Sequence, residues 1–247
     1  MVIILAAIIG WLCGYIVNYL ADVLPVTRSL SAPACLACGK HFSFLDFLLF
    51  RPCQACGKTR SARAWIVQIG LTAASIWMWL TPPGRLGFWA GIGLLAFFSL
   101  IAVIDLEYRL VLHPVSLAGA VIGLVVGIWQ KGPVDTLIGG AAGFGMMFLL
   151  YTFGILFTRL MARIRHQEID EVALGYGDVN LAGVIGLMLG WPEIVGGLLL
   201  AILLGGIISA LIMAGMAVLR RYKAMTAIPY APFLLIGAII FLYIPKQ

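Results

Sequence analysis

Charged residues are scarce in this sequence, and their scarcity excludes an ordinary soluble domain. Only 11% of the 247 residues are Asp, Glu, Lys or Arg, whereas 63% are hydrophobic. Soluble domains are about 45–50% apolar and about 25% charged. We therefore expect a polytopic membrane protein whose helices contact the lipid bilayer.

Two further features are missing. No basic stretch interleaved with aromatic residues is present, so the net charge of +6 gives no indication of nucleic-acid binding. No basic segment precedes the first apolar run, which reaches Leu24 without a clear cleavage site. Because the core of a signal peptide is shorter, we expect this run to be retained as a membrane helix.

Eight apolar stretches are candidates for crossing the bilayer, and they predict an all-α fold, a polytopic membrane helix bundle of about eight transmembrane helices. Several carry glycines spaced by four residues, a pattern that lets membrane helices pack closely. We expect a first transmembrane helix at 1–25, a cytoplasmic loop with four cysteines at 26–63 and seven membrane helices at 64–247. The stretches are Val2–Leu24, Ala64–Leu80, Leu86–Ile104, Val115–Trp129, Val134–Phe157, Asp178–Gly190, Ile194–Leu219 and Ala227–Ile244.

The distribution of Lys and Arg predicts the orientation. If the N-terminus lies outside, thirteen of the sixteen basic residues fall on one side of the membrane. The positive-inside rule makes that side cytoplasmic. Asp105 and Asp178, which were not counted, then both fall at the cytoplasmic boundary.

The four cysteines of the polar loop form two Cys-x-x-Cys pairs, and each pair is followed by a glycine. Two such pairs can bring four thiolates to one tetrahedral metal ion, as in zinc ribbons. Disulfides and redox-active pairs are the alternatives, but a cytoplasmic loop is reducing and no thioredoxin-like βαβ pattern accompanies the pairs. We expect a structural Zn²⁺ held by Cys35, Cys38, Cys53 and Cys56.

Two aspartates border apolar stretches, where a carboxylate is costly and therefore a candidate for function. Asp105 ends one stretch, with Glu107 as a nearby competitor. Asp178 follows Gly175 and Gly177, which can kink the backbone and allow close approach, although an N-cap role is equally compatible with its position. Two adjacent carboxylates share one proton and can act as base and acid toward a peptide bond.

Taken together, these motifs resemble the type IV prepilin peptidases, membrane aspartic proteases of the GxGD type. The resemblance covers nearly the whole chain and would make residues 64–247 the protease domain. It implies that Asp105 and Asp178 are the catalytic pair, with Gly175 and Gly177 as backbone support. The matching positions are Gly14 and Asn18 before Pro25, both cysteine pairs, Asp105 with Pro114, Gly175 to Asp178, Leu187 to Trp191 and Ile228 to Phe233.

The same resemblance predicts the partners. It implies prepilin or pseudopilin substrates, which lose a short basic leader at the cytoplasmic face of the bacterial inner membrane. Acids in the loop before the GxGD motif could bind that leader, although a solvated loop is the simpler interpretation. These acids are Glu168, Asp170 and Glu171.

The chain departs from the family pattern at several positions. Asn180 replaces the Lys usual two residues after the GxGD aspartate, and Val23 replaces an expected Arg. Many members also methylate the new N-terminus with S-adenosylmethionine, which goes with an Asp-Asn-Ile-Pro segment and a Glu. Here that segment is absent and the Glu appears as Gln68, so methyltransferase activity stays open.

Two other functional classes remain as alternatives. A transporter or channel could use a pair of carboxylates, but its site is usually near the membrane midplane between repeated halves. A non-enzymatic assembly scaffold could carry the zinc loop and would tolerate changes to the aspartates.

Overall fold

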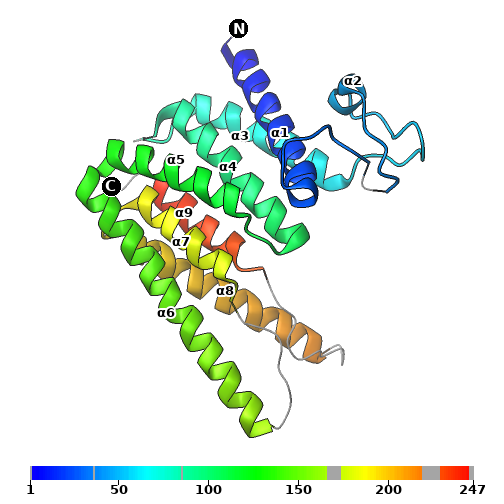
Figure 1. Cartoon of the computed structure of the whole chain (residues 1–247). Coiled ribbons are helices and arrows are strands. Elements are labelled where there is room, and N and C mark those ends of the chain that lie inside the picture. The colour runs from blue at the N-terminus through cyan, green and yellow to red at the C-terminus, as the bar shows by residue number, and fades with distance from the viewer. Residues whose placement is uncertain (1, 36, 85, 166–173, 219–228, 245–247) are drawn as a thin grey trace. The chain divides into compact units, whose positions relative to one another are not determined.

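The computed structural model describes residues 2–35, 37–84, 86–165, 174–218 and 229–244 (Figure 1). These residues form nine helices, and their only β pairing is an isolated bridge between Ala34 and His41. The predicted all-α class is confirmed. Contacts divide the chain into two compact units, Met1–Tyr108 and Arg109–Gln247, and each is described by itself. The domain limits expected at 25 and 63 stay a prediction.

The first unit is built from α1 (Val2–Thr27), α3 (Ala62–Leu80) and α4 (Gly87–Tyr108), which pack against one another. A short helix, α2 (Phe44–Leu48), lies in the loop between α1 and α3. The glycine spacing of α1 permits its close contact with α3. A Cβ at Gly10 would lie 2.6 Å from the Cβ of Ser75, and one at Gly14 would lie 2.8 Å from Gln68 Oε1.

The second unit is centred on α7 (Tyr176–Leu189), and nine of its fourteen residues are buried. Its neighbours α5, α6, α8 and α9 all contact it (Figure 1). Because these helices surround α7, they enclose a segment that opens with the GxGD motif. The bounds of the four are His113–Lys131, Pro133–Arg165, Glu193–Val218 and Ala231–Tyr243.

Glycines bring α6 and α7 into backbone contact. A Cβ added to Gly139 of α6 would lie 2.5 Å from the carbonyl oxygen of Gly186 in α7. One added to Gly143 would lie 2.4 Å from the carbonyl oxygen of Ala182. Side chains at these positions would force the helices apart, so the predicted packing role of the spaced glycines is confirmed here.

Eight of the nine helices correspond to the eight predicted stretches. By length and composition five of them could cross a membrane, namely α1, α4, α5, α6 and α8. The apolar helices α7 and α9 have 14 and 13 residues. At 1.5 Å per residue they extend only about 20 Å, less than the ~30 Å hydrocarbon core. The structure supports a membrane helix bundle, and the number of crossings stays a prediction.

Candidate active site and metal centre

Asp178 is the third residue of α7 and stabilises the start of that helix. Gly175 occupies the N-cap position, and its backbone N–H donates to Asp178 Oδ2 at 3.2 Å. The positive end of the helix dipole also favours an ionised carboxylate here. The alternative that Asp178 is itself the N-cap is therefore wrong, because the N-cap residue lies three positions earlier, at Gly175. Its carboxylate nevertheless helps to cap the helix, and the residue is only 8% exposed.

Gly177 is required by close packing within the second unit. A Cβ built on Gly177 would lie 2.8 Å from the Cβ of Val111, in the segment before α5. At Gly175 the nearest atom would be Asp178 Oδ2, at the ordinary contact distance of 3.4 Å. The close approach expected of the motif's glycines therefore occurs at Gly177.

Tyr230 is a neighbour of Asp178 to which sequence reasoning gave no role. It immediately precedes α9 and is half-buried. Its phenol interacts electrostatically with the Asp178 carboxylate. A phenol is ordinarily protonated at neutral pH, so Tyr230 can act as a donor near the carboxylate. In the sequence, the only indication of a role for Tyr230 was its place in the Ile228 to Phe233 motif.

A cavity of about 720 Å³ lies among α5, α6 and α7. Its walls are largely apolar and include the small residues Ala120, Gly140 and Gly183. Polar groups come from His113, Ser116 and Asn180, and Asn180 lies two residues after Asp178 on α7. The residue that replaces the expected lysine therefore lines an apolar cavity close to the candidate catalytic carboxylate.

Asp105 belongs to the first unit, near the end of α4. It is 5% exposed, whereas its competitor Glu107 accepts a hydrogen bond from Arg63 Nε at 3.0 Å. Glu107 is thus engaged in an ion pair on the surface of that unit. Asp105 and Asp178 lie in different units, so their pairing stays a prediction.

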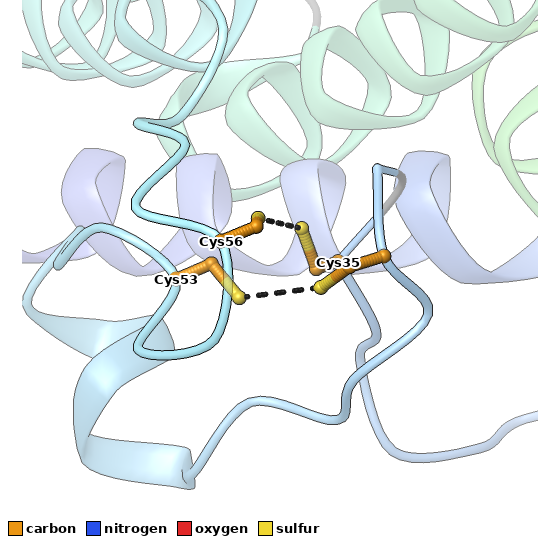
Figure 2. Close-up of side chains that lie close together, drawn as sticks. Cys35, Cys53 and Cys56 are labelled. Atoms are coloured by element: carbon orange, nitrogen blue, oxygen red, sulfur yellow. Dashed lines mark hydrogen bonds between the residues drawn. The ribbon is translucent and has the colours of Figure 1, made fainter.

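The four loop cysteines meet at one point, as predicted. Their Sγ atoms all lie within 4.8 Å of one another, and two Sγ pairs, Cys35 with Cys56 and Cys38 with Cys53, are separated by 3.6 Å (Figure 2). Tetrahedral coordination with Zn–S bonds of about 2.3 Å places sulfurs about 3.8 Å apart. The cluster therefore has the spacing of a tetrahedral site that could hold one metal ion such as zinc, and the four cysteines are free thiols.

Each cysteine pair is shaped by its own backbone turn. The N–H of Gly39 donates to the carbonyl of Cys35 at 2.8 Å, and that of Gly57 to Cys53 at 2.7 Å. Both glycines have positive φ, +74° and +68°, which a residue with a Cβ rarely adopts. The backbone N–H groups of Ala55 and Cys56 lower the pKa of Cys53 to about 6, which favours the thiolate that a metal requires.

Gln68 has a structural role at the position where the methyltransferase pattern has Glu. It is completely buried, and its Nε2 donates to the carbonyl of Trp11 at 2.6 Å. Asn18 Nδ2 donates to Gln68 Oε1 at 3.4 Å, so Gln68 links α1 with α3. An ionised glutamate could not donate to Trp11. The predicted leader-binding acids Glu168, Asp170 and Glu171 lie outside the described residues.

Comparison with known proteins agrees with these motifs. Three relatives named prepilin leader peptidase/N-methyltransferase come from Pseudomonas putida, Aeromonas salmonicida and Myxococcus xanthus, with 27%, 29% and 27% identity. The matches cover 87%, 75% and 83% of this chain and 74%, 59% and 62% of the relatives. The chain thus spans less than two thirds of two of these relatives. No solved structure gives a significant match.

The family match falls on the segment that contains both candidate catalytic residues. Residues 92–210 match the type IV leader peptidase family. This interval includes α4 with Asp105 and the start of α7 with Gly175, Gly177 and Asp178. Over residues 92–210, this chain is therefore similar to the type IV leader peptidase family.

Proposed function

We propose that the chain is a membrane aspartic endopeptidase that removes the short basic leader from prepilin-like or pseudopilin substrates. The observation that carries the proposal is Asp178, held at the start of the buried helix α7 inside a segment that matches a leader peptidase family. The family match and the names of the relatives favour this function over a transporter or a scaffold.

The chemistry follows from two carboxylates that share one proton, with Asp105 as the partner of Asp178. The ionised member takes a proton from water, which attacks the scissile carbonyl. The protonated member donates to the carbonyl oxygen, and the proton taken from water then passes to the amine nitrogen as the C–N bond breaks. The Gly175 N–H and the start of α7 favour the ionised form of Asp178, so we assign the base to Asp178 and the acid to Asp105.

The cavity beside α7 suits a substrate with an apolar segment after its leader. Its apolar walls could hold that segment while the scissile bond reaches Asp178. Cleavage would occur at the cytoplasmic membrane face, as the distribution of basic residues predicts. The leader would then lie near Glu168, Asp170 and Glu171, and its binding by these acids stays part of the proposal.

Methylation is the second activity in the relatives' names. S-adenosylmethionine would be a cofactor of this chain only if the chain retains methyltransferase activity. At position 68 this chain has a buried glutamine in place of the glutamate of the methyltransferase pattern. We therefore base the proposal on cleavage alone.

The direct test is incubation of purified protein with a prepilin peptide, followed by mass spectrometry. We expect two fragments separated at the end of the leader. A gain of about 14 Da on the new N-terminus, one methyl group in place of a hydrogen, would reveal methylation separately. An intact peptide, from protein that is folded and loaded with metal, would contradict the proposal.

Gly177→Ala should lower kcat/KM by about 10²-fold. The new Cβ must displace Val111 or the start of α7, and a displacement of about 1 Å at a catalytic group costs about this much. Gly175→Ala is the matched control, because its Cβ has ordinary contact distances and its φ is −79°. The measurement compares the cleavage rates of Gly177→Ala and Gly175→Ala, once the two variants are shown to have equal thermal stability. Equal rates would show that the packing at Val111 does not position Asp178.

A further inference from the structure

The loop that carries the four cysteines, residues 26–63, turns back along α1 toward the apolar half of that helix (Figure 1). Its short helix α2 ends beside Tyr15 of α1, whose hydroxyl donates to the carbonyl of Leu48. One turn further along α1, the ring of Tyr19 meets that of Phe47 at a centroid distance of 6.3 Å. Because a helix rises 1.5 Å per residue, Tyr15 lies about 10 Å before Asp22. The end of α2 therefore lies beside the apolar part of α1.

Charged side chains mark the polar end of the first unit. Asp22 of α1 forms ion pairs with Arg60 and Arg63. Arg63 also pairs with Glu107, near the end of α4. Asp22 and Cys35 both line a cavity of about 170 Å³, so the cysteine cluster lies at this level too. The part of α1 that precedes Asp22 carries no charged residue, and charges at hydrocarbon depth are costly, so this level marks the limit of the hydrocarbon region.

Aromatic rings gather on the apolar side of this charged level. Phe50 follows α2, and its ring centre lies 5.4 Å from that of Tyr15 and 4.7 Å from that of Trp65 in α3. Trp11 of α1 meets Tyr15 edge-on at 6.0 Å. Trp and Tyr are enriched where a membrane protein passes from hydrocarbon to headgroups, because their rings are apolar and their N–H or O–H groups are polar. The cluster has the composition and the position of such an interfacial belt.

The backbone after α2 is constrained. Phe50 has a φ of +53°, a conformation that is rare for a residue with a large side chain. The N–H of Arg51 donates to the carbonyl of Asp46 at 3.0 Å and closes the turn. A backbone of this kind persists only where surrounding contacts fix it, and the two ring contacts of Phe50 supply them. The neighbouring Leu49 is thereby held in one place.

This turn presents an apolar surface to its surroundings. Leu49 is 56% exposed, and Trp65, Ile66 and Ile69 continue the exposed apolar surface along α3. Because α3 packs against α1, which is long and apolar enough to cross a membrane, this side of α3 faces lipid. Contiguous exposed apolar side chains mark sites of interaction with membranes or other proteins. Here the surface of the loop is continuous with a lipid-facing helix.

We propose that the turn at Leu49 and Phe50 anchors the four-cysteine loop to the surface of the lipid bilayer. The bilayer is the partner because the turn lies on the apolar side of the charged level and joins the lipid-facing side of α3. The hydrogen bond from Tyr15 and the ring contacts of Phe50 fix the depth of the turn, and Leu49 enters the boundary between headgroups and acyl chains. The anchor holds the cysteine cluster close to the membrane, a role independent of peptide cleavage.

The first test uses the full-length protein in phosphatidylcholine nanodiscs. A photoreactive benzophenone amino acid replaces Leu49 in one variant and Lys40 in another, and mass spectrometry measures the adducts after illumination. Lys40 is the matched control, because it is an exposed residue of the same loop whose carbonyl accepts from the N–H of Cys35. We expect at least about tenfold more phosphatidylcholine adduct at position 49, since only this position reaches the acyl boundary. Equal yields at the two positions, or a cross-link from position 49 to a second copy of the chain, would overturn the proposal.

Leu49→Glu should release the turn from the membrane, because a carboxylate at the acyl boundary is costly. We expect amide hydrogen exchange of residues 47–50 in nanodiscs to become at least about tenfold faster, while Tm stays unchanged. Leu30→Glu is the matched control, because Leu30 is an exposed leucine of the same loop outside α2 and the aromatic cluster. If Leu49→Glu lowers Tm, Leu49→Ser provides the same comparison without a charge. Unchanged exchange in the Leu49 variants, or an equal increase in Leu30→Glu, would contradict the anchor.

Discussion

Asp105→Asn and Asp178→Asn should each lower kcat/KM for a prepilin peptide by at least about 10³-fold. An amide cannot take up or release the proton, and a positioned acid or base contributes about 10²–10⁴-fold. In the proposed mechanism the two carboxylates act as one unit, so the double variant should be little worse than either single variant. Cleavage assayed by mass spectrometry, with thermal stability measured in parallel, provides the comparison.

Glu107→Gln is the control for this prediction. Glu107 lies two residues after Asp105 on the same helix but pairs with Arg63, so its loss should change kcat/KM by less than about tenfold. Turnover at the wild-type rate in either aspartate variant would refute the catalytic assignment. Strictly additive losses in the double variant would instead show that the two residues do not form a pair.

Removing one cysteine of the cluster should abolish metal binding. Cys35→Ser or Cys53→Ser leaves three thiols, and we expect zinc to fall from one ion per chain to nearly none. Structural zinc sites contribute apparent binding free energies of about 10–16 kcal/mol, so the loop should lose its fold with the metal. Metal analysis and the rate of thiol alkylation measure the two effects.

Cys13→Ser is the matched control, because Cys13 lies in α1 away from the cluster and should leave zinc content unchanged. Chelation should loosen residues 26–63 before it changes cleavage, since the metal is assigned no chemical step. Wild-type protein without zinc, with all four loop thiols freely alkylated, would contradict the assignment.

The cysteine centre shows what local sequence can predict. Each pair folds through a turn of six residues, closed by Cys35 N–H to the Lys40 carbonyl at 2.8 Å and by Cys53 N–H to the Lys58 carbonyl at 3.0 Å. Such turns depend only on neighbouring residues and on a glycine at the position of positive φ. The spacing therefore predicted both pairs and the ligand set.

The candidate catalytic residues show where prediction stopped. Asp178 was identified as a candidate from the sequence, because a carboxylate bordering an apolar stretch is recognisable in one dimension. The hydrogen bond between Gly175 and Asp178 was not predicted, because the first residue of a helix is uncertain by a few positions from sequence. The approach of Val111 to Gly177, and of Tyr230 to Asp178, joins residues more than fifty positions apart. No local pattern encodes such contacts.

By itself, the sequence determined the membrane class, eight apolar segments, the cysteine cluster and the two candidate acids. These depend on composition, on hydrophobic run length and on short spacings, which act within one element. Only the tertiary structure decided that α7 is the enclosed helix of its unit and that Gln68 joins α1 to α3. Those features depend on which distant side chains meet when helices pack, and packing is a property of the whole fold.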